Sequence, residues 1–149
     1  MTKQLDACAH ELMDTAPQIM QSIRVEMRHG RGSDISIPQF RSLTFVQRHP
    51  DSSLSSLAEH LGLTLPSVSK LVEGLVKQKL IIRQESTVDR RRLTLVLTQI
   101  GTSIVDSARA GAQTSLAKRL GELSEVELET VCRAMQILRP IFVQDKYSL

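Results

Sequence analysis

Apolar residues recur every three or four positions through most of this chain, which is the spacing of the buried face of an amphipathic helix. The clearest helix begins near residue 65 and has four such positions: Val68, Leu71, Val72 and Leu75. A shorter helix precedes it over 54–61, with inward positions Leu54, Leu57, Ala58 and Leu61. Gly62 lies between them, where a left-handed C-terminal residue is favoured, so the pattern predicts two helices joined by a tight turn.

Small polar residues indicate where these two helices begin. Ser53 and Thr64 precede them and are predicted to be their N-caps, with Pro66 tolerated in the first turn of the second helix. The other face of that second helix is polar or small: Pro66, Ser67, Ser69, Lys70, Glu73, Gly74 and Lys77. The helix is therefore expected to bury one face and leave the opposite one free.

An earlier helix is expected over 38–48. Pro38 suits its first position, and Ser36 or Ile37 would be its cap. Pro50 ends it, because the residue before a proline avoids the helical region. The predicted inward residues are Phe40, Leu43, Thr44 and Val46.

After the central helices the pattern changes to that of two short strands, over 80–85 and 92–97. In the second strand Thr94 and Val96 would share one face, and the other would carry Leu93, Leu95 and Leu97. Between the strands lies a basic tip, Asp89-Arg90-Arg91-Arg92. The segment is predicted to be a hairpin that presents arginines at its end.

Helices are predicted at both ends of the chain. Residues 1–30 carry an apolar stripe of Leu5, Cys8, Leu12, Ile19, Ile23 and Met27. Pro17 interrupts it, either starting a new helix capped by residue 14 or 15 or kinking a long one. Thr98 would cap a helix to about residue 119, and Ser124 with Glu127 has the spacing of a capping box. Pro140 kinks or ends the last helix, whose apolar residues are Leu128, Val131, Cys132, Met135 and Leu138.

The positive charge of the chain is concentrated in its middle. Residues 41–92 carry nine Lys/Arg against five Asp/Glu, a net +4, whereas 1–40 have four against five and 93–149 six against six. A basic centre between nearly neutral flanks is what binding to phosphate groups requires. A slightly basic solvated surface is the plainer alternative.

Composition narrows the class of protein. The 149 residues include 41% hydrophobic and only 3% aromatic residues, with no Trp, which favours a core of packed helices. The two cysteines, Cys8 and Cys132, have no metal-type spacing, and a reducing compartment fits them. No signal peptide and no apolar run of bilayer length is found, so a soluble cytoplasmic protein without cofactor or membrane partner is expected.

Two helices joined by a tight turn, followed by a basic hairpin, form the pattern of a winged helix-turn-helix. The second helix can enter a DNA major groove, about 12 Å wide. Arginines at the hairpin tip can reach a neighbouring minor groove, where negative potential is concentrated. The sequence therefore indicates a mainly α fold with a small β-hairpin wing that binds double-stranded DNA.

In order and spacing of these parts the chain resembles the MarR family of bacterial transcription regulators. The residues that carry the resemblance are Leu57-Ala58, Thr64, Ser67, Leu75, Leu80-Ile81-Ile82-Arg83, Asp89-Arg90-Arg91, Leu97-Thr98 and Gly101. It is specific between about 53 and 101. Lys79 departs from the family, which commonly has glycine there, so the turn before the first wing strand must form without the ease that glycine gives to positive φ.

The resemblance implies a homodimeric regulator, most simply a ligand-responsive repressor, that reads a pseudo-palindromic operator. The dimerisation helices would lie in 1–35 and 120–149, and 36–119 would be the winged helix-turn-helix with its connecting helix. The apolar terminal helices favour the same assembly, although they could instead complete a monomer core. A dimer would place its recognition helices about one DNA turn apart, roughly 34 Å.

The predicted DNA contacts lie on the recognition helix and the wing: Ser53, Thr64, Pro66, Ser67, Ser69, Lys70, Arg90, Arg91 and Arg92. Arg91 is the foremost candidate, because a guanidinium enters a narrow minor groove at less desolvation cost than an ammonium. Asp89 has the wrong sign for DNA and is expected to support the wing. Ser53 and Thr64 also serve as caps, a role compatible with phosphate contact.

A small aromatic or phenolic effector is a further expectation from the family. The candidate residues are Met20, Ile23, Arg24, Met27 and Arg28, for which dimer core or solvated surface is the favoured plainer role. Peroxide sensing by a cysteine is disfavoured, because Cys8 and Cys132 fall on apolar stripes and are expected to be buried and inert. Zinc sensing would need His10, His29, His49 and His60, which lack a recognised spacing.

Two other classes of function remain to be distinguished. An enzyme is disfavoured, because the chain has no nucleophile elbow, phosphate loop or zinc-protease motif. A winged helix that binds another protein would leave the arginine tip without a role. Salt-dependent binding to duplex DNA separates that module from a DNA-binding regulator.

Overall fold

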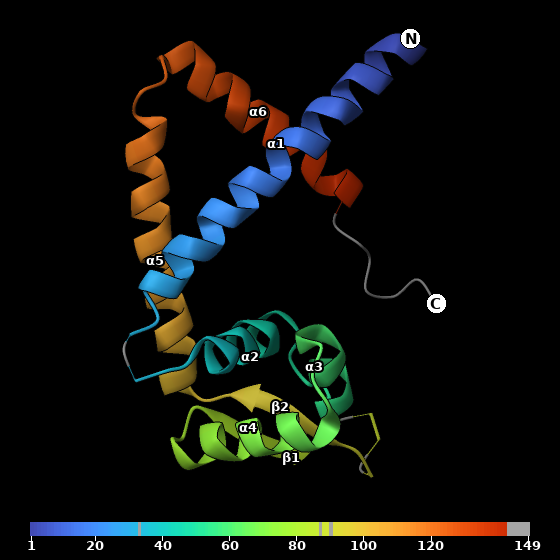
Figure 1. Ribbon diagram of the computed structural model, residues 1–149, viewed down its shortest axis with the longest axis vertical. Helices are drawn as coiled ribbons and strands as arrows, with labels where there is room; N and C mark the ends of the chain where they lie inside the picture. The colour runs from blue at the N-terminus through green and yellow to red at the C-terminus, as the bar shows by residue number, and fades with distance from the viewer. Residues whose placement is uncertain (33, 87, 90, 143–149) are drawn as a thin grey trace. The chain divides into compact units, whose positions relative to one another are not determined.

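The structure is a computed structural model that describes residues 1–32, 34–86, 88–89 and 91–142. Over these residues the chain is mainly helical, with one antiparallel hairpin between the fourth and fifth helices (Figure 1). The chain divides into two compact units, Met1–Gln113 and Thr114–Leu149. The predicted fold class, mainly α with a small β-hairpin wing, is confirmed.

A cluster of three helices and the hairpin forms the core of the first unit. The helices are α2 (Ile37–Arg48), α3 (Leu54–Leu61) and α4 (Leu65–Lys77). Their most deeply buried apolar side chains are Leu43, Val46, Leu57, Val68, Val72 and Leu75. Each such side chain contributes roughly 1.5–3 kcal/mol by leaving water, so this apolar spacing is what holds the three helices together.

The helix starts follow from local side-chain hydrogen bonds. Ser36 caps α2 in a capping box with Gln39, which decides between the two expected caps of that helix. Ser53 accepts from the backbone N–H of Ser56 at the start of α3, and Thr64 accepts from that of Ser67 at the start of α4. Gly62 ends α3 with φ of 68°, the left-handed conformation expected of it.

One inward position of α2 was predicted wrongly. Thr44 is only half-buried, whereas Ser42 is fully buried beside Leu43. Ser42 is tolerated inside because its hydroxyl donates to the carbonyl of Pro38 at 2.8 Å, so no polar group is left unsatisfied. Leu54 and Leu71, also expected inside, are half-buried at the edge of the core.

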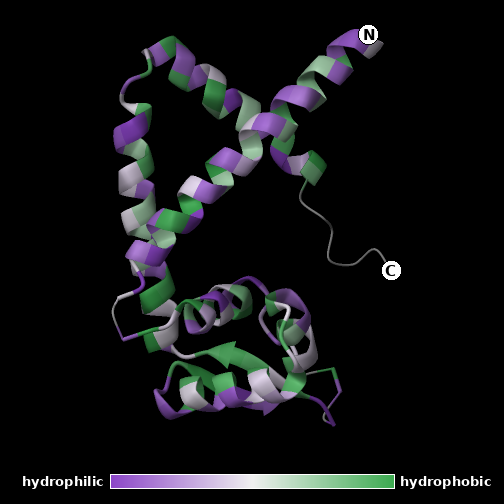
Figure 2. Ribbon diagram, viewed as in Figure 1, coloured by the Kyte–Doolittle hydropathy of each residue, from purple (hydrophilic) through white to green (hydrophobic). Residues whose placement is uncertain are grey.

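The wing consists of β1 (Ile81–Glu85) and β2 (Leu93–Leu97), paired from Ile81 opposite Leu97 to Glu85 opposite Leu93. Leu95 is buried and Leu97 half-buried on the core face, but Leu93 is 59% exposed near the tip. Thr94, on the opposite face, is nevertheless buried at 4% exposure. Figure 2 shows β2 as an almost continuously hydrophobic arrow among these helices.

The turn between α4 and β1 adopts positive φ without a glycine. Lys79 has φ of 60°, and its N–H donates to the carbonyl of Val76. The N–H of Leu80 donates to the carbonyl of Leu75, which completes the hydrogen-bond pattern of a Schellman C-cap. The chain therefore makes the turn that glycine would make, with lysine in the left-handed position.

The first helix, α1 (Thr2–His29), is continuous through Pro17, so the alternative of a single long helix holds. The backbone just after this helix packs closely against α5 (Gln99–Leu120): a Cβ added at Gly30 would lie 2.8 Å from the Cα of Ala108. α5 contributes Gly101, Val105, Ala108 and Ala112 to the buried side of the first unit. Thr98 caps it by accepting from the N–H of Gly101 at 3.0 Å, as expected.

In the second unit, α6 (Glu125–Phe142) begins with the predicted capping box. Glu127 accepts from both the backbone N–H and the hydroxyl of Ser124, each at 2.8 Å, and these bonds hold the pKa of the Glu127 carboxyl below its usual value. Pro140 lies inside the helix, which runs two residues further.

Among the described residues, neither terminal helix has a fully buried side chain in the single chain. α1 and α6 are described over their whole lengths, and neither has a buried side chain, while Figure 2 shows apolar and polar residues alternating along both. Cys8 and Cys132 are therefore exposed in the single chain, and the prediction of two buried cysteines is wrong for it. The apolar spacing that suggested burial marks one face of each helix, but in the described part of the chain that face is uncovered at both cysteines.

Candidate nucleic-acid interface

The start of α4 presents a small, polar surface. Pro66, Ser67 and Lys70 are exposed, and Ser69 is half-buried. Val68 and Val72, on the opposite side of the helix, are completely buried. The apolar spacing thus anchors one face of α4 to the core and directs the other, which carries small side chains and one ammonium, toward solvent.

The capping hydroxyls of the helix-turn-helix are already used within the protein. Thr64 donates its hydroxyl hydrogen to Oγ of Ser67 at 2.9 Å and accepts from the Ser67 N–H at 3.4 Å. Ser53 Oγ lies 2.9 Å from Ser56 Oγ. Since Ser67 accepts from Thr64, its own hydroxyl hydrogen is not spent in that bond, and Ser67 can donate to a phosphate or a base edge.

The wing tip is closed by short-range hydrogen bonds. The N–H of Ser86 donates to the carbonyl of Arg92 at 2.8 Å, and the N–H of Arg92 donates to the carbonyl of Asp89 at 3.0 Å. Asp89 Oδ1 accepts from the backbone N–H of Arg91 at 3.0 Å. Arg91 and Arg92 are exposed, and Arg90 lies outside the described residues. Asp89 therefore holds the backbone N–H of Arg91, and its supporting role in the wing stays a prediction.

Ser86 also shapes the tip, and sequence reasoning missed it. Its Oγ accepts from the backbone N–H groups of Val88 and Asp89, at 3.2 and 3.3 Å. A serine commonly forms a turn in this way, by accepting from the N–H groups two and three residues further along the chain. The sequence therefore contained the signal.

Basic residues also gather on α2 and α3. The Phe45 ring lies 4.6 Å from the rings of His49 and His60, stacked on His60 and tilted to His49. Partial burial, then the positive charges of Arg41 and Arg48, lower the pKa of His60 from its ordinary value of 6.5. The two arginines add to the positive charge of the first unit.

The five candidate effector residues do not share one environment. Met20 and Arg24 are exposed, whereas Ile23, Met27 and Arg28 are half-buried, and Met27 packs against the core. Arg28 donates through Nε to the carbonyl of Arg24 at 3.3 Å. Two hollows on the described surface were compared with these residues, and neither is lined by any of the five.

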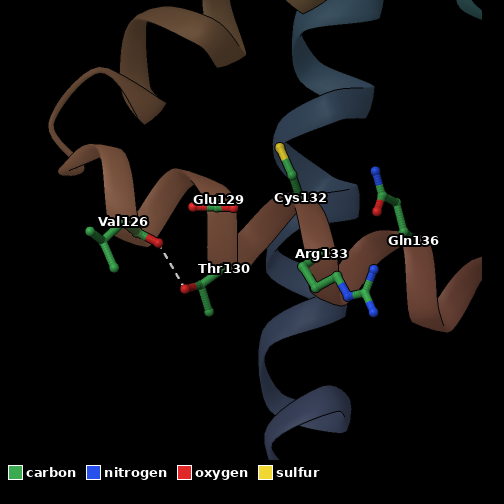
Figure 3. A pocket seen from close by; sticks show the side chains of 6 residues that line it. All are labelled: Val126, Glu129, Thr130, Cys132, Arg133 and Gln136. Atoms are coloured by element: carbon green, nitrogen blue, oxygen red, sulfur yellow. Dashed lines mark hydrogen bonds between the residues drawn. The ribbon is translucent and has the colours of Figure 1, made fainter.

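The larger hollow lies on α6 alone, and Figure 3 shows its six side chains: Val126, Glu129, Thr130, Cys132, Arg133 and Gln136. The Thr130 hydroxyl points back to its own helix and donates to the carbonyl of Val126 at 2.8 Å. A hollow on a single helix surface encloses no small molecule, and its apolar members belong to the uncovered face described above.

The described residues give no indication of a metal centre or of a membrane span. Within these ranges, no three His, Cys, Asp or Glu side chains come together as metal ligands would. None of the helices in the described ranges combines the length and the apolar character needed to cross a bilayer.

Comparison with known proteins places this geometry among transcription regulators. Residues 33–92, which hold α2 to the wing, match the family model of the MarR family. The HTH-type regulator YfiV of Bacillus subtilis is 29% identical over 105 residues, covering 70% of this chain and 66% of YfiV. The HTH-type transcriptional repressor MdtR of the same organism is 26% identical over 127 residues, covering 85% and 82% of the two chains.

Solved structures show the same fold. The regulator Tm0710 of Thermotoga maritima has a TM-score of 0.76 at 20% identity, covering 91% of this chain and 99% of that one. A variant of S. aureus MepR bound to an oligodeoxyribonucleotide has a TM-score of 0.57 at 23% identity, covering 89% and 96%. MepR bound to ethidium bromide has a TM-score of 0.63 at 23% identity, covering 87% and 95%.

Proposed function

The chain is a DNA-binding helix-turn-helix transcription regulator of the MarR family, and from this premise we propose that it is a cytoplasmic, ligand-responsive repressor that binds a pseudo-palindromic operator as a homodimer. Its relatives regulate transcription, so the enzyme alternative is excluded. The observation that carries the proposal is that the exposed polar face of α4 belongs to the same unit as Arg91, which is exposed and whose backbone N–H is bound by Asp89.

In this proposal the first turns of α4 enter the major groove. Ser67 and Lys70 supply a hydroxyl donor and an ammonium there, while Pro66 and Ser69 allow close approach. Ser53 and Thr64 lie at helix N-termini, whose partial positive charge favours phosphate. Most base contacts would come from the α4 surface, and the caps would set its position on the backbone.

The wing would enter the adjacent minor groove. Arg91 is exposed and its backbone N–H is held by Asp89, so less freedom of Arg91 would be lost when its guanidinium enters the groove. Arg92, with Arg90, would flank it on phosphates. Asp89 itself would remain a support, since its charge repels DNA.

The homodimer is proposed from the uncovered terminal helices, in the segments 1–35 and 120–149. Large apolar side chains that are exposed in the single chain include Leu5, Met13, Ile19, Met20, Val126, Val131, Met135, Ile137, Ile141 and Phe142. Soluble monomers rarely expose this many apolar groups on two helices. A second copy would bury them, and a two-fold assembly would space the two α4 helices for a palindromic site.

Repression and ligand response are proposed by analogy with named relatives. MdtR is described as a repressor, and MepR has been solved with ethidium bromide, an aromatic cation. An aromatic or phenolic effector would act if it bound better to a conformation that cannot hold DNA. Met20, Ile23, Arg24, Met27 and Arg28 remain the proposed contacts.

The test is binding of a fluorescent duplex from the DNA upstream of the protein's own gene, measured over a series of salt concentrations. Arg91→Ala is expected to weaken binding by about ten-fold or more and to reduce the salt slope by about one unit, at an unchanged melting temperature. Arg109→Ala, an exposed arginine on α5, is the matched control and should change little. No attraction to any duplex at low salt would contradict the proposal and favour a protein-binding module.

A further inference from the structure

The loop between α2 and α3 lies against the wing and forms a β-bridge with it at one residue pair. Ser52 forms an isolated antiparallel bridge with Leu95, and the N–H of Leu95 donates to the carbonyl of Ser52 at 2.8 Å. Leu95 is also paired with Arg83 on its other side. Across this point the order is the α2–α3 loop, β2 and β1, so the helix-turn-helix is connected directly to the middle of the wing.

The register determines which side chains can link the loop to the wing. Residues opposite one another share a face, so Ser52, Leu95 and Arg83 lie on the core face. Within the described part of the chain, the buried Ser52 Oγ and the Arg83 Nε and Nη2 atoms have no hydrogen-bond partner. On the core face, therefore, the loop is joined to the wing by packing and by the backbone bond, and these three side-chain atoms add no hydrogen bond.

The opposite face supplies a side-chain link through Asp51. Its Oδ1 accepts from Gln84 Nε2 at 3.3 Å and lies 3.5 Å from the hydroxyl of Thr94. That hydroxyl also lies 3.3 Å from the carbonyl of Gln84, so its single hydrogen is shared between two acceptors. One carboxylate thus contacts both strands of the wing, at the Gln84–Thr94 pair. Only one further pair, Glu85–Leu93, separates it from the arginine turn.

Asp51 occupies this place at a conformational cost. Its φ is 62°, a left-handed value that favours glycine and that aspartate tolerates with some strain. A carboxylate near the DNA-binding surface also opposes the positive charge of this segment. Neither feature helps DNA binding directly, but both are explained if the side chain is needed to hold the wing.

We propose that Asp51 is the positioning residue of the wing: it ties both wing strands to the α2–α3 loop and so sets where Arg91 lies relative to α4. The inference rests on the proposed function, because it concerns how that function is performed. Without the carboxylate the wing stays folded, joined to the loop by the Ser52–Leu95 bridge. Because α4 binds the major groove, it fixes which minor groove lies beside the wing, and the tip is then less well placed for that groove. Contacts misplaced by an ångström lose much of their binding energy.

The experiment compares two duplexes of equal length, one with A-tracts, whose minor groove is narrow, and one rich in G·C. Asp51→Gly removes the carboxylate but accepts φ of 62° freely, so its melting temperature should equal or exceed that of the wild type. It should lower affinity for the A-tract duplex by roughly five-fold and lose most of the A-tract preference, as Arg91→Ala does. Asp51→Asn, which keeps an acceptor oxygen, should retain the preference.

The outcomes separate this inference from the proposed function. A wild type that binds neither duplex, or binds both equally, overturns both ideas about the wing. If Arg91→Ala loses the preference while Asp51→Gly keeps it, the wing reads DNA but Asp51 does not position it. Should Asp51→Gly melt early, Gln84→Leu decides the matter. It removes the donor from an exposed wing residue, leaves the loop backbone intact, and should show the same loss of preference.

Discussion

The hydroxyl of Thr98 donates a hydrogen bond to the backbone carbonyl of Lys79, with 2.6 Å between the two oxygens. The same Thr98 oxygen accepts from the N–H of Gly101, and the Thr98 N–H donates to the carbonyl of Leu80. The end of α4 and the start of α5 are therefore tied together at the base of the wing. The junction also binds the carbonyl of Lys79, the residue that takes the left-handed conformation at the end of α4.

Replacement of that lysine should stabilise the protein. Lys79→Gly removes the cost of positive φ but adds freedom to the unfolded chain, so a net gain of about 0.5–1 kcal/mol is expected. For a chain of this size that corresponds to a rise of roughly 1–4 °C in melting temperature, measured by circular dichroism. Lys77→Gly, at the last helical residue of α4, is the control and should instead destabilise. A lower melting temperature for Lys79→Gly would show that the lysine side chain has a structural role.

Two glycines of α5 should respond oppositely to alanine. A Cβ at Gly101 would collide with the backbone carbonyl oxygen of Leu80, in the junction just described. Gly101→Ala is therefore expected to cost about 1–3 kcal/mol of unfolding free energy, because the backbone must shift. Gly111 faces open space, so Gly111→Ala should gain up to about 1 kcal/mol from helix propensity. Urea unfolding measures the free energy of both variants. Equal changes would mean that α5 does not approach the carbonyl of Leu80 as described.

Acidification should destabilise the fold through His60. Burial and the charges of Arg41 and Arg48 lower its folded pKa, so the unfolded state binds more protons as the pH falls through and below 6.5. The His60 contribution to stability is present above that pH and lost below it, and it is small because the ring is largely exposed. His60→Gln should flatten the fall in melting temperature with pH, and Arg41→Gln should flatten it partly. Parallel curves for all three proteins would exclude His60 as the cause.

The terminal helices provide a test of the dimer. Met135 is 48% exposed on α6 in the single chain and would be covered by a second copy. Met135→Lys should raise the dissociation constant roughly ten-fold or more, because a charge would have to be desolvated. Gln136→Lys adds the same charge at the neighbouring polar position and should have a smaller effect. Sedimentation velocity measures the two, and a monomeric wild type would contradict the proposed assembly.

Local chemistry explains why much of the fold could be predicted. The caps at Ser53, Thr64 and Ser124 act on groups three residues away, so the sequence itself contains both partners. The buried face of α4 and the arginine tip are likewise periodic or contiguous features. The positions of Ser42 and Thr44 were one exception, because a satisfied hydroxyl can be buried where an apolar pattern gives no sign of it.

The sequence by itself determined the helices, the hairpin and the basic segment, since each depends on residues within a few positions of one another. Only the tertiary structure decided that Asp51 meets Gln84 and Thr94, 33 and 43 residues away, and that Thr98 meets Lys79. It also decided that Thr94 is buried on the outer face of the wing, where the α2–α3 loop lies against it. Contacts of this kind form only after chain segments have packed, and no periodicity along the chain encodes which segments will meet.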